Sequence, residues 1–177
     1  MPVDWRIEPL RRDHDRAGFG CGEPALDEYL IRFARQNHES GVARTFVAVN
    51  DVEPARALGY YSLTAGGIDK AKLPPSVRRF PNFPLPMARL ARLAVDRSQQ
   101  GKGLGEYLLL DALARCVRVA DDLGIAVVII DAKHEQARAF YLRYGFKTLP
   151  DQPLTLWLLL PTLREVLDGQ RRNASRR

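Results

Sequence analysis

A glycine-rich segment between a predicted strand and a predicted helix constrains this chain most. Residues 87–96 read as a buried strand, and residues 106–123 repeat apolar side chains at helical spacing. Between them lies Gln100-Gly101-Lys102-Gly103-Leu104-Gly105. The first N–H groups of a helix have no intrahelical partners and lie at the positive end of its dipole, and glycine lets a ligand approach the backbone. The segment therefore predicts a pyrophosphate site, with Lys102 as an additional cation.

The spacing of the glycines excludes two other phosphate-binding loops. A Walker loop needs Gly-Lys-Ser/Thr after four intervening residues, which Gly103-Leu104 does not provide. A dinucleotide fingerprint starting at Gly101 would need a glycine where Glu106 stands. The segment does match the pattern Q/R-x-x-G-x-G/A. Glycine turns before helices are also common for structural reasons, so the rest of the chain must decide between a ligand site and a simple turn.

The composition is that of a soluble globular domain of ordinary size. The chain has 177 residues, 46% of them hydrophobic and 27% charged. We expect a single domain over residues 1–169. The sequence has no secretory leader and no apolar run long enough to span a membrane, which predicts a cytoplasmic protein. The two cysteines and three histidines have no metal-ligand spacing, so no metal site is predicted.

Positive charge is concentrated in two stretches. The net charge is +6, and residues 170–177 contain four arginines and no acid. These residues are predicted to be a basic, disordered tail because they are polar and lack periodicity. Residues 70–95 also lack Asp and Glu, and they contain Lys70, Lys72, Arg78, Arg79, Arg89 and Arg92. This second run suggests an anionic macromolecular partner, although charge runs more often form a solvated face.

The order of predicted elements indicates a mixed α/β fold. Residues 125–130 are a run of apolar, mostly β-branched side chains reached through a helical crossover, as in a central parallel strand buried on both faces. Hairpins flank that crossover. The proline-rich residues 73–86 are expected to be irregular. Strands are predicted at residues 5–10, 45–49, 57–63, 88–95, 125–130, 146–149 and 154–160, and helices at 26–33, 106–123 and 135–144.

Two motifs carry a resemblance to the GNAT acetyltransferases. Residues 100–105 match their acyl-CoA pyrophosphate loop, and Ala137-Arg138-Ala139-Phe140-Tyr141 with Gly145-Phe146 matches their A-x-x-F-Y…G-F segment. The motifs stand in the family's order, on either side of the strand at 125–130. The resemblance implies the GNAT fold, a strongly twisted mixed β-sheet flanked by helices, with acyl-CoA in the cleft between two splayed central parallel strands.

A narrower resemblance is to the GNAT toxins of bacterial toxin–antitoxin pairs. It is carried by residues 19–22, 26–30, 43–47, 59–63 and 90–96. Those toxins transfer acetyl from acetyl-CoA to the α-amine of aminoacyl-tRNA and so block translation. The resemblance implies this reaction, a small ribbon-helix-helix antitoxin, a homodimer, and contact with operator DNA only through the antitoxin.

The family pattern also implies site residues. Tyr141 is the expected catalytic acid, because a phenol with a reference pKa of about 10 is protonated at neutral pH. It could instead orient or deprotonate the amine, or be a core aromatic on one stripe with Phe140 and Tyr144, of which Tyr144 is the alternative hydroxyl. His134 stands where many members have an asparagine that contacts CoA and starts the helix. Acetyl-CoA is expected at Leu93, Ala94, Val95, Gln100, Gly101, Lys102, Gly103, Leu104, Gly105 and Glu106.

For the RNA, Arg78 and Arg79 are the first expected phosphate contacts, followed by Arg35 and Arg92. Weaker expectations are Arg32, Lys70, Lys72 and Arg89. Phosphate contacts carry no sequence information, so they do not indicate which tRNA is used. Two alternatives stay open at this point: a GNAT enzyme for a small amine or protein N-terminus, and a non-catalytic module that binds acyl-CoA or nucleic acid.

Overall fold

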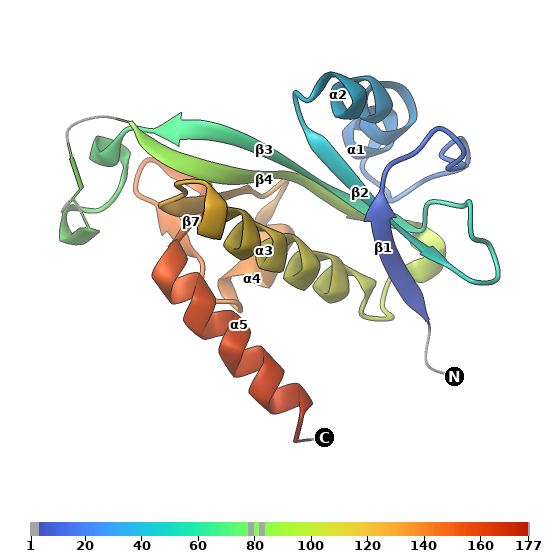
Figure 1. Ribbon diagram of the computed structural model, residues 1–177. Coiled ribbons are helices and arrows are strands. Elements are labelled where there is room, and N and C mark those ends of the chain that lie inside the picture. Colours follow the sequence, from blue (N-terminus) through green and yellow to red (C-terminus); the bar gives the residue numbers. More distant parts are fainter. Residues whose placement is uncertain (1–3, 78–79, 82–83, 177) are drawn as a thin grey trace. The chain divides into compact units, whose positions relative to one another are not determined.

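Figure 1 shows a computed structural model that describes residues 4–77, 80–81 and 84–176. Within these residues seven strands pair in the order β1-β2-β3-β4-β5-β7-β6. β4 and β5 are parallel, whereas β1–β2, β2–β3, β5–β7 and β6–β7 are antiparallel, which confirms the mixed sheet. The strands are β1 (Trp5–Pro9), β2 (Arg44–Asn50), β3 (Gly59–Ile68), β4 (Leu85–Val95), β5 (Val127–Asp131), β6 (Lys147–Leu149) and β7 (Gln152–Leu159).

The chain forms two compact units. The first comprises Met1–Thr64 and Ala91–Ala112, and the second comprises Ala65–Leu90 and Leu113–Arg177. The single domain expected over residues 1–169 stays a prediction. Among the helices of the described residues, none combines the length and apolar character that a membrane span requires.

The first unit is built on a helical segment packed against β2 and β3. The segment runs through α1 (Pro24–Glu28), a π-helical turn η1 (Tyr29–Phe33) and α2 (Ala34–Ser40). Its apolar side chains, such as Leu30, are buried with Val47 and Tyr60 in one core cluster. The segment ends at Gly41, whose φ of 78° suits glycine. The helix predicted at 26–33 is therefore longer, because the polar residues after Ala34 continue it on the exposed side.

Glycine at position 59 allows α3 (Leu104–Asp122) to approach β3 closely. A Cβ on Gly59 would lie 2.9 Å from Cδ1 of Leu108 and 3.1 Å from Cδ2 of Leu104. Both leucines are fully buried, or nearly so, which confirms the apolar stripe predicted for this helix. The start of α3 is therefore fixed by packing against the sheet.

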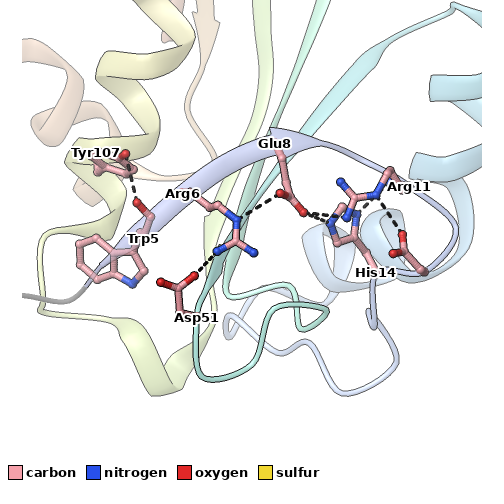
Figure 2. Close-up of polar contacts among 8 residues, drawn as sticks. Trp5, Arg6, Glu8, Arg11, His14, Asp51 and Tyr107 are labelled. Carbon is pink, nitrogen blue, oxygen red and sulfur yellow. Dashed lines mark hydrogen bonds and ion pairs between the residues drawn. The ribbon is translucent and has the colours of Figure 1, made fainter.

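A polar network ties β1 to the segment that follows it (Figure 2). The buried His14 ring accepts a hydrogen bond at Nδ1 from the Arg11 N–H (2.9 Å), and its Nε2 lies 2.7 Å from Oε1 of Glu8. Because Nδ1 is the acceptor, Nε2 carries the proton that Glu8 accepts. Glu8 also pairs with the guanidinium groups of Arg6 (3.4 Å) and Arg11 (3.0 Å). Burial opposes ionisation of Glu8, but its bonds to His14 and Arg11 outweigh that effect and lower its pKa.

The second unit is centred on β5. Residues Val127–Ile130 are completely buried, as predicted for a central strand. They pair with β4 on one side and with β7 on the other. Val127 and Ile129 belong to a core cluster with Ile68, Leu85 and Trp157. Helix α4 (Glu135–Leu142) follows β5, and Gly145, with a φ of 90°, ends that region. The predicted helix and its glycine stop are thus confirmed.

Helix α5 (Leu160–Ala174) differs from what the sequence analysis expected. The sequence pattern predicts no helix over residues 160–169 and predicts disorder over residues 170–177. The helix begins with Pro161 in its first turn and buries Leu160, Leu163 and Leu167, whose spacing places them on one side. Packing of that apolar stripe stabilises the helix, and residues 170–174 continue it.

Candidate functional site

The predicted pyrophosphate loop has the backbone conformation of an anion-binding turn. Gly101 and Gly103 have φ angles of 76° and 92°, a region that side chains other than glycine rarely adopt. The first bond of α3 runs from the Tyr107 N–H to the Gly103 carbonyl (3.1 Å). No heavy atom of the described residues beyond the chain neighbours lies within 4 Å of a Cβ built on either glycine. The loop backbone at the helix start is therefore accessible to a phosphate, and the exposed Lys102 adds positive charge.

Gln100 holds this loop in place. Its side-chain Nε2 donates to the carbonyl of Val95 (3.0 Å) at the end of β4 and to the carbonyl of Cys21 (2.7 Å). Both hydrogens of the amide are thus used within the protein. Gln100 therefore shapes the loop through its bonds to Cys21 and Val95, which the sequence motif alone does not predict.

Asp96 fixes the turn between β4 and the glycine loop, a role that the sequence analysis did not assign to it. It is 5% exposed and accepts hydrogen bonds from the Ser98 N–H (3.0 Å), the Ser98 hydroxyl (2.7 Å) and the Gly20 N–H (3.0 Å). Burial opposes its ionisation, but the bonds from Ser98 and Gly20 outweigh burial and lower its pKa. The Asp-x-Ser spacing is typical of a local side-chain-to-backbone turn and was the available signal.

The end of β4 lies beside the start of α3. Alternation along the strand puts Leu93 and Val95, both half-buried, on one face and the buried Ala94 on the other. A Cβ on Gly105 would lie 3.8 Å from Cγ2 of Val95. Ala94 packs in the core with Tyr60, so only its backbone is available to a ligand.

Tyr141 is buried on α4. It is 5% exposed, and its ring lies 5.3 Å from that of Phe140. Burial, followed by the negative charge of Asp131, raises its pKa well above the ordinary value for tyrosine. The hydroxyl therefore retains its proton at neutral and moderately alkaline pH, which favours a donor role over that of a base.

His134 starts α4. Its Nδ1 accepts a hydrogen bond from the Ala137 N–H (3.1 Å), the bond that an N-cap side chain makes. Histidine thus performs the helix-starting role expected of asparagine at this position.

Two members of the basic run are engaged within the protein. Arg89 Nη1 lies 2.5 Å from Oδ2 of Asp131, and Thr155 Oγ1 lies 3.4 Å from the other carboxylate oxygen. Lys70 Nζ donates to the carbonyl of Phe80 (3.0 Å). These contacts stabilise the second unit and weaken the expectation that Arg89 and Lys70 contact RNA. Arg78 and Arg79, the first choices from the sequence, lie outside the described residues.

The first unit has a basic hollow on its helical segment. It has a volume of about 480 Å³ and is lined by Arg16, Ile31, Arg32, Arg35, Gln36, Glu39 and Ser40. Arg16 Nη1 donates to the carbonyls of Leu30 (3.0 Å) and Ile31 (3.3 Å) in the π-helical turn η1. Burial, then the positive charge of Arg35, lowers the pKa of Arg16. The sequence analysis named Arg35 as an RNA contact but did not name Arg16, which lies outside the helix in sequence and reaches the hollow only through the tertiary fold.

Arg92 packs against an aromatic ring. Its guanidinium carbon lies 3.7 Å from the ring centroid of Tyr29, in the geometry of a cation–π contact. Tyr29 in turn stacks on Tyr60 at a centroid distance of 6.3 Å. Part of the Arg92 side chain is therefore used in packing.

Comparison with known proteins places the chain in a family. Residues 41–148 match the model of the acetyltransferase (GNAT) domain. The chain belongs to the GNAT acetyltransferase family, as the two sequence motifs implied. It is 43% identical over 153 residues to the tRNA-acetylating toxin of Mycobacterium tuberculosis (strain ATCC 25618 / H37Rv), which covers 86% of this chain and 90% of that protein.

Solved structures of similar proteins extend the comparison. AtaT complexed with acetyl-methionyl-tRNAfMet superposes with a TM-score of 0.85 at 29% identity, covering 92% of this chain and 99% of that one. A tyrosine-to-phenylalanine mutant of the toxin AtaT, bound to the C-terminus of the antitoxin AtaR and to acetyl-CoA, superposes with a TM-score of 0.78 at 26% identity, covering 92% and 97%. The GNAT fold expected from the sequence is therefore confirmed.

Proposed function

We propose that this chain is the toxin of a toxin–antitoxin pair and transfers acetyl from acetyl-CoA to the α-amine of aminoacyl-tRNA, which blocks translation. The observation that carries the proposal is its 43% identity, over 86% of its length, to a tRNA-acetylating toxin. The glycine loop and the protonated Tyr141 supply the two chemical functions that such a reaction needs from the protein.

Acetyl-CoA, when bound, supplies the acetyl group as an activated thioester. The N–H groups of residues 101–106 and the Lys102 ammonium are proposed to hold its pyrophosphate, because they combine an accessible backbone, a helix N-terminus and a cation. Backbone groups of Leu93 and Val95 are proposed to contact the pantetheine arm. Gln100 acts by holding the loop, since its amide hydrogens bond to Cys21 and Val95.

Tyr141 is proposed as the catalytic acid. Transfer moves a proton from the attacking amine to the departing thiolate, so a hydroxyl that keeps its proton suits donation to the sulfur. The raised pKa of Tyr141, caused by burial and then by Asp131, supports this role over that of a base. His134 supports it indirectly by starting the helix that carries Tyr141.

The basic hollow supports an RNA substrate. Glu28 pairs with Arg32 (3.3 Å) and Glu39 pairs with Arg12 (3.3 Å), whereas Arg35 has no carboxylate within ion-pair distance among the described residues. Arg35 also lies close enough to Arg16 for its charge to lower the pKa of Arg16. An RNA phosphate in the hollow would offset this repulsion, so we include Arg35 among the RNA contacts. Arg92, Arg78 and Arg79 remain proposed contacts.

The proposed partners follow the same resemblance. The structure of AtaT with the C-terminus of AtaR supports a small antitoxin as the neutralising partner. We further propose that this antitoxin has a ribbon-helix-helix fold and that the toxin contacts operator DNA only through it. The toxin is also proposed to form a homodimer and to act in the cytoplasm.

The test is an acetyl-transfer assay with purified protein, acetyl-CoA and total charged bacterial tRNA, read by filter retention and mass spectrometry. The wild type is compared with Tyr141→Phe and with the matched control Tyr144→Phe. Tyr144 is also buried and also packs on Phe140, at 5.4 Å. We expect N-acetyl-aminoacyl-tRNA with the wild type, a loss of about 100-fold or more for Tyr141→Phe, and little change for Tyr144→Phe. Folded protein that binds acetyl-CoA but acetylates no tRNA would overturn the proposal.

A further inference from the structure

Helix α5 has an anchored half and an exposed half. In the first half, Leu163 and Leu167 are buried, and Arg164 pairs with Asp121 (2.8 Å). From residue 171 to residue 176 every side chain is exposed. Figure 1 shows α5 leaving the end of β7, with the C-terminus at its far end. The helix also lies outside residues 41–148, which match the family model.

The exposed half is basic and lacks large apolar side chains. Arg171, Arg172 and Arg176 lie here, and no acid occurs after Asp168. Among the described residues, no carboxylate lies within ion-pair distance of these three arginines. The polar contacts nearby are local: Arg172 Nε donates to the Asp168 carbonyl (3.4 Å), and Ser175 Oγ donates to the Arg171 carbonyl (3.1 Å). Arg172 lies on the side of the helix opposite Leu163 and Leu167, and Arg176 follows in the turn after the helix ends at Ala174.

This composition selects among possible partners. A membrane-surface helix needs large apolar side chains to insert, and a stable protein interface needs an apolar centre. After Leu167 the sequence DGQRRNASRR contains neither. Uncompensated guanidinium groups with nearby amides and hydroxyls instead suit phosphate oxygens. Because Arg171 and Arg172 stand on a helix and the Arg176 N–H bonds to the Asn173 carbonyl (3.4 Å), less conformational freedom is lost on binding than from a disordered tail.

We propose that the exposed half of α5 and the turn that follows it bind the sugar–phosphate backbone of the tRNA substrate through Arg171, Arg172 and Arg176. The inference rests on the proposed function for the identity of the RNA. The helix supplies affinity and position without contacting the reacting groups, so its removal weakens RNA binding and leaves the chemical step unchanged.

The test measures binding of deacylated total tRNA by fluorescence anisotropy over a series of salt concentrations. The variants are the triple Arg171→Gln/Arg172→Gln/Arg176→Gln, the corresponding triple with lysine, and the single Arg172→Gln. The matched control is Arg118→Gln on α3, which removes one exposed helical arginine without an ion pair among the described residues. Thermal unfolding by circular dichroism confirms that each variant is folded.

We expect the glutamine triple to raise the Kd for tRNA at least tenfold. It should also reduce the magnitude of the slope of log association constant against log salt concentration by about 2 to 3, because each lost phosphate contact contributes roughly 0.7 to 0.9 to that slope. The lysine triple should keep most of the slope, and Arg118→Gln should bind as the wild type does. Wild-type binding by the glutamine triple, or equal weakening by Arg118→Gln and Arg172→Gln, would overturn the proposal.

The same variants separate this inference from the proposed function. If the wild type acetylates charged tRNA, the glutamine triple should raise KM for that substrate and leave kcat unchanged; an unchanged KM would overturn the inference alone. If the wild type acetylates no tRNA, the proposed function fails, while the binding of deacylated tRNA still decides the inference.

Discussion

The side-chain amide of Gln100 donates to the carbonyl of Cys21, 79 residues earlier in the chain, at 2.7 Å. Its second bond, to the Val95 carbonyl at 3.0 Å, joins the glycine loop to the end of β4. The motif glutamine therefore fixes where the loop backbone lies.

Replacing Gln100 should weaken acetyl-CoA binding more than it weakens the fold. Gln100→Ala removes two hydrogen bonds at an exposed position, where each contributes about 0.5–0.7 kcal/mol, the low end of the usual range. If that energy is needed to order the loop for the ligand, we expect the Kd to rise roughly five- to tenfold. Calorimetric titration with acetyl-CoA measures this. Gln99→Ala, at the preceding position, is the control and should bind acetyl-CoA normally. An unchanged Kd for Gln100→Ala would show that the loop keeps its shape without these bonds.

Alanine at Gly103 should destabilise the protein through backbone strain. The φ of 92° is unfavourable for alanine, and the cost is about 1–2 kcal/mol in the free energy of unfolding. No steric clash adds to this cost, because a Cβ there meets no heavy atom within 4 Å among the described residues. Urea unfolding measures the loss, together with weaker acetyl-CoA binding. Gly124→Ala also meets no atom within 4 Å and has no positive φ, so it should be neutral or slightly stabilising. Equal effects at both positions would contradict the strain argument.

Glu8 should make the protein less stable in acid. Its pKa is lowered in the folded protein, because bonds to His14 and Arg11 outweigh burial. A carboxyl with a depressed folded-state pKa stabilises the fold above its unfolded pKa, near 4.5, and that stability is lost as pH falls through the lower folded-state value. Glu8→Gln should therefore reduce the free energy of unfolding at pH 7 and flatten its dependence on pH below about 4.5.

The control for Glu8 is Glu39→Gln. Glu39 pairs with Arg12, and their side chains are 47% and 78% exposed, compared with 17% for Glu8. An exposed pair of this kind contributes about 0–1 kcal/mol, so little change is expected. Urea unfolding at several pH values tests both variants. If the free energy of unfolding of Glu8→Gln still falls below about pH 4.5 as in the wild type, other carboxyl groups cause the loss of stability in acid.

The rate of acetyl transfer should not fall at moderately alkaline pH through deprotonation of Tyr141. Burial and the charge of Asp131 raise the pKa of Tyr141, so the hydroxyl stays protonated as the acceptor amine loses its proton. We expect kcat/KM to rise through the pKa of the amine and then remain level to about pH 10, the reference value for tyrosine. Steady-state rates on one purified aminoacyl-tRNA measure this. A fall between pH 8 and 9 in the wild type that is absent in a weakly active Tyr141→Phe would show that Tyr141 loses its proton in this range, which would contradict its raised pKa.

Local sequence patterns predicted most of the elements. The alternating and apolar runs indicated all seven strands of the described residues, and the glycines at 41 and 145 marked the ends of helical regions. The loop and Tyr141 were found because a phosphate turn and a GNAT motif both depend on residues close in sequence. Helix α5 was missed because its apolar stripe of Leu160, Leu163 and Leu167 is interrupted by charged residues and followed by a basic stretch.

The sequence by itself determined the α/β class, the glycine turn at a helix start and the phenol on a second helix, because each is encoded within a few consecutive residues. Only the tertiary structure decided which long-range partners these residues meet. Gln100 reaches Cys21, Arg16 reaches the carbonyls of Leu30 and Ile31, and Arg89 pairs with Asp131. Such contacts join segments far apart in the chain, and burial then sets the pKa of groups such as Tyr141, which no local pattern specifies.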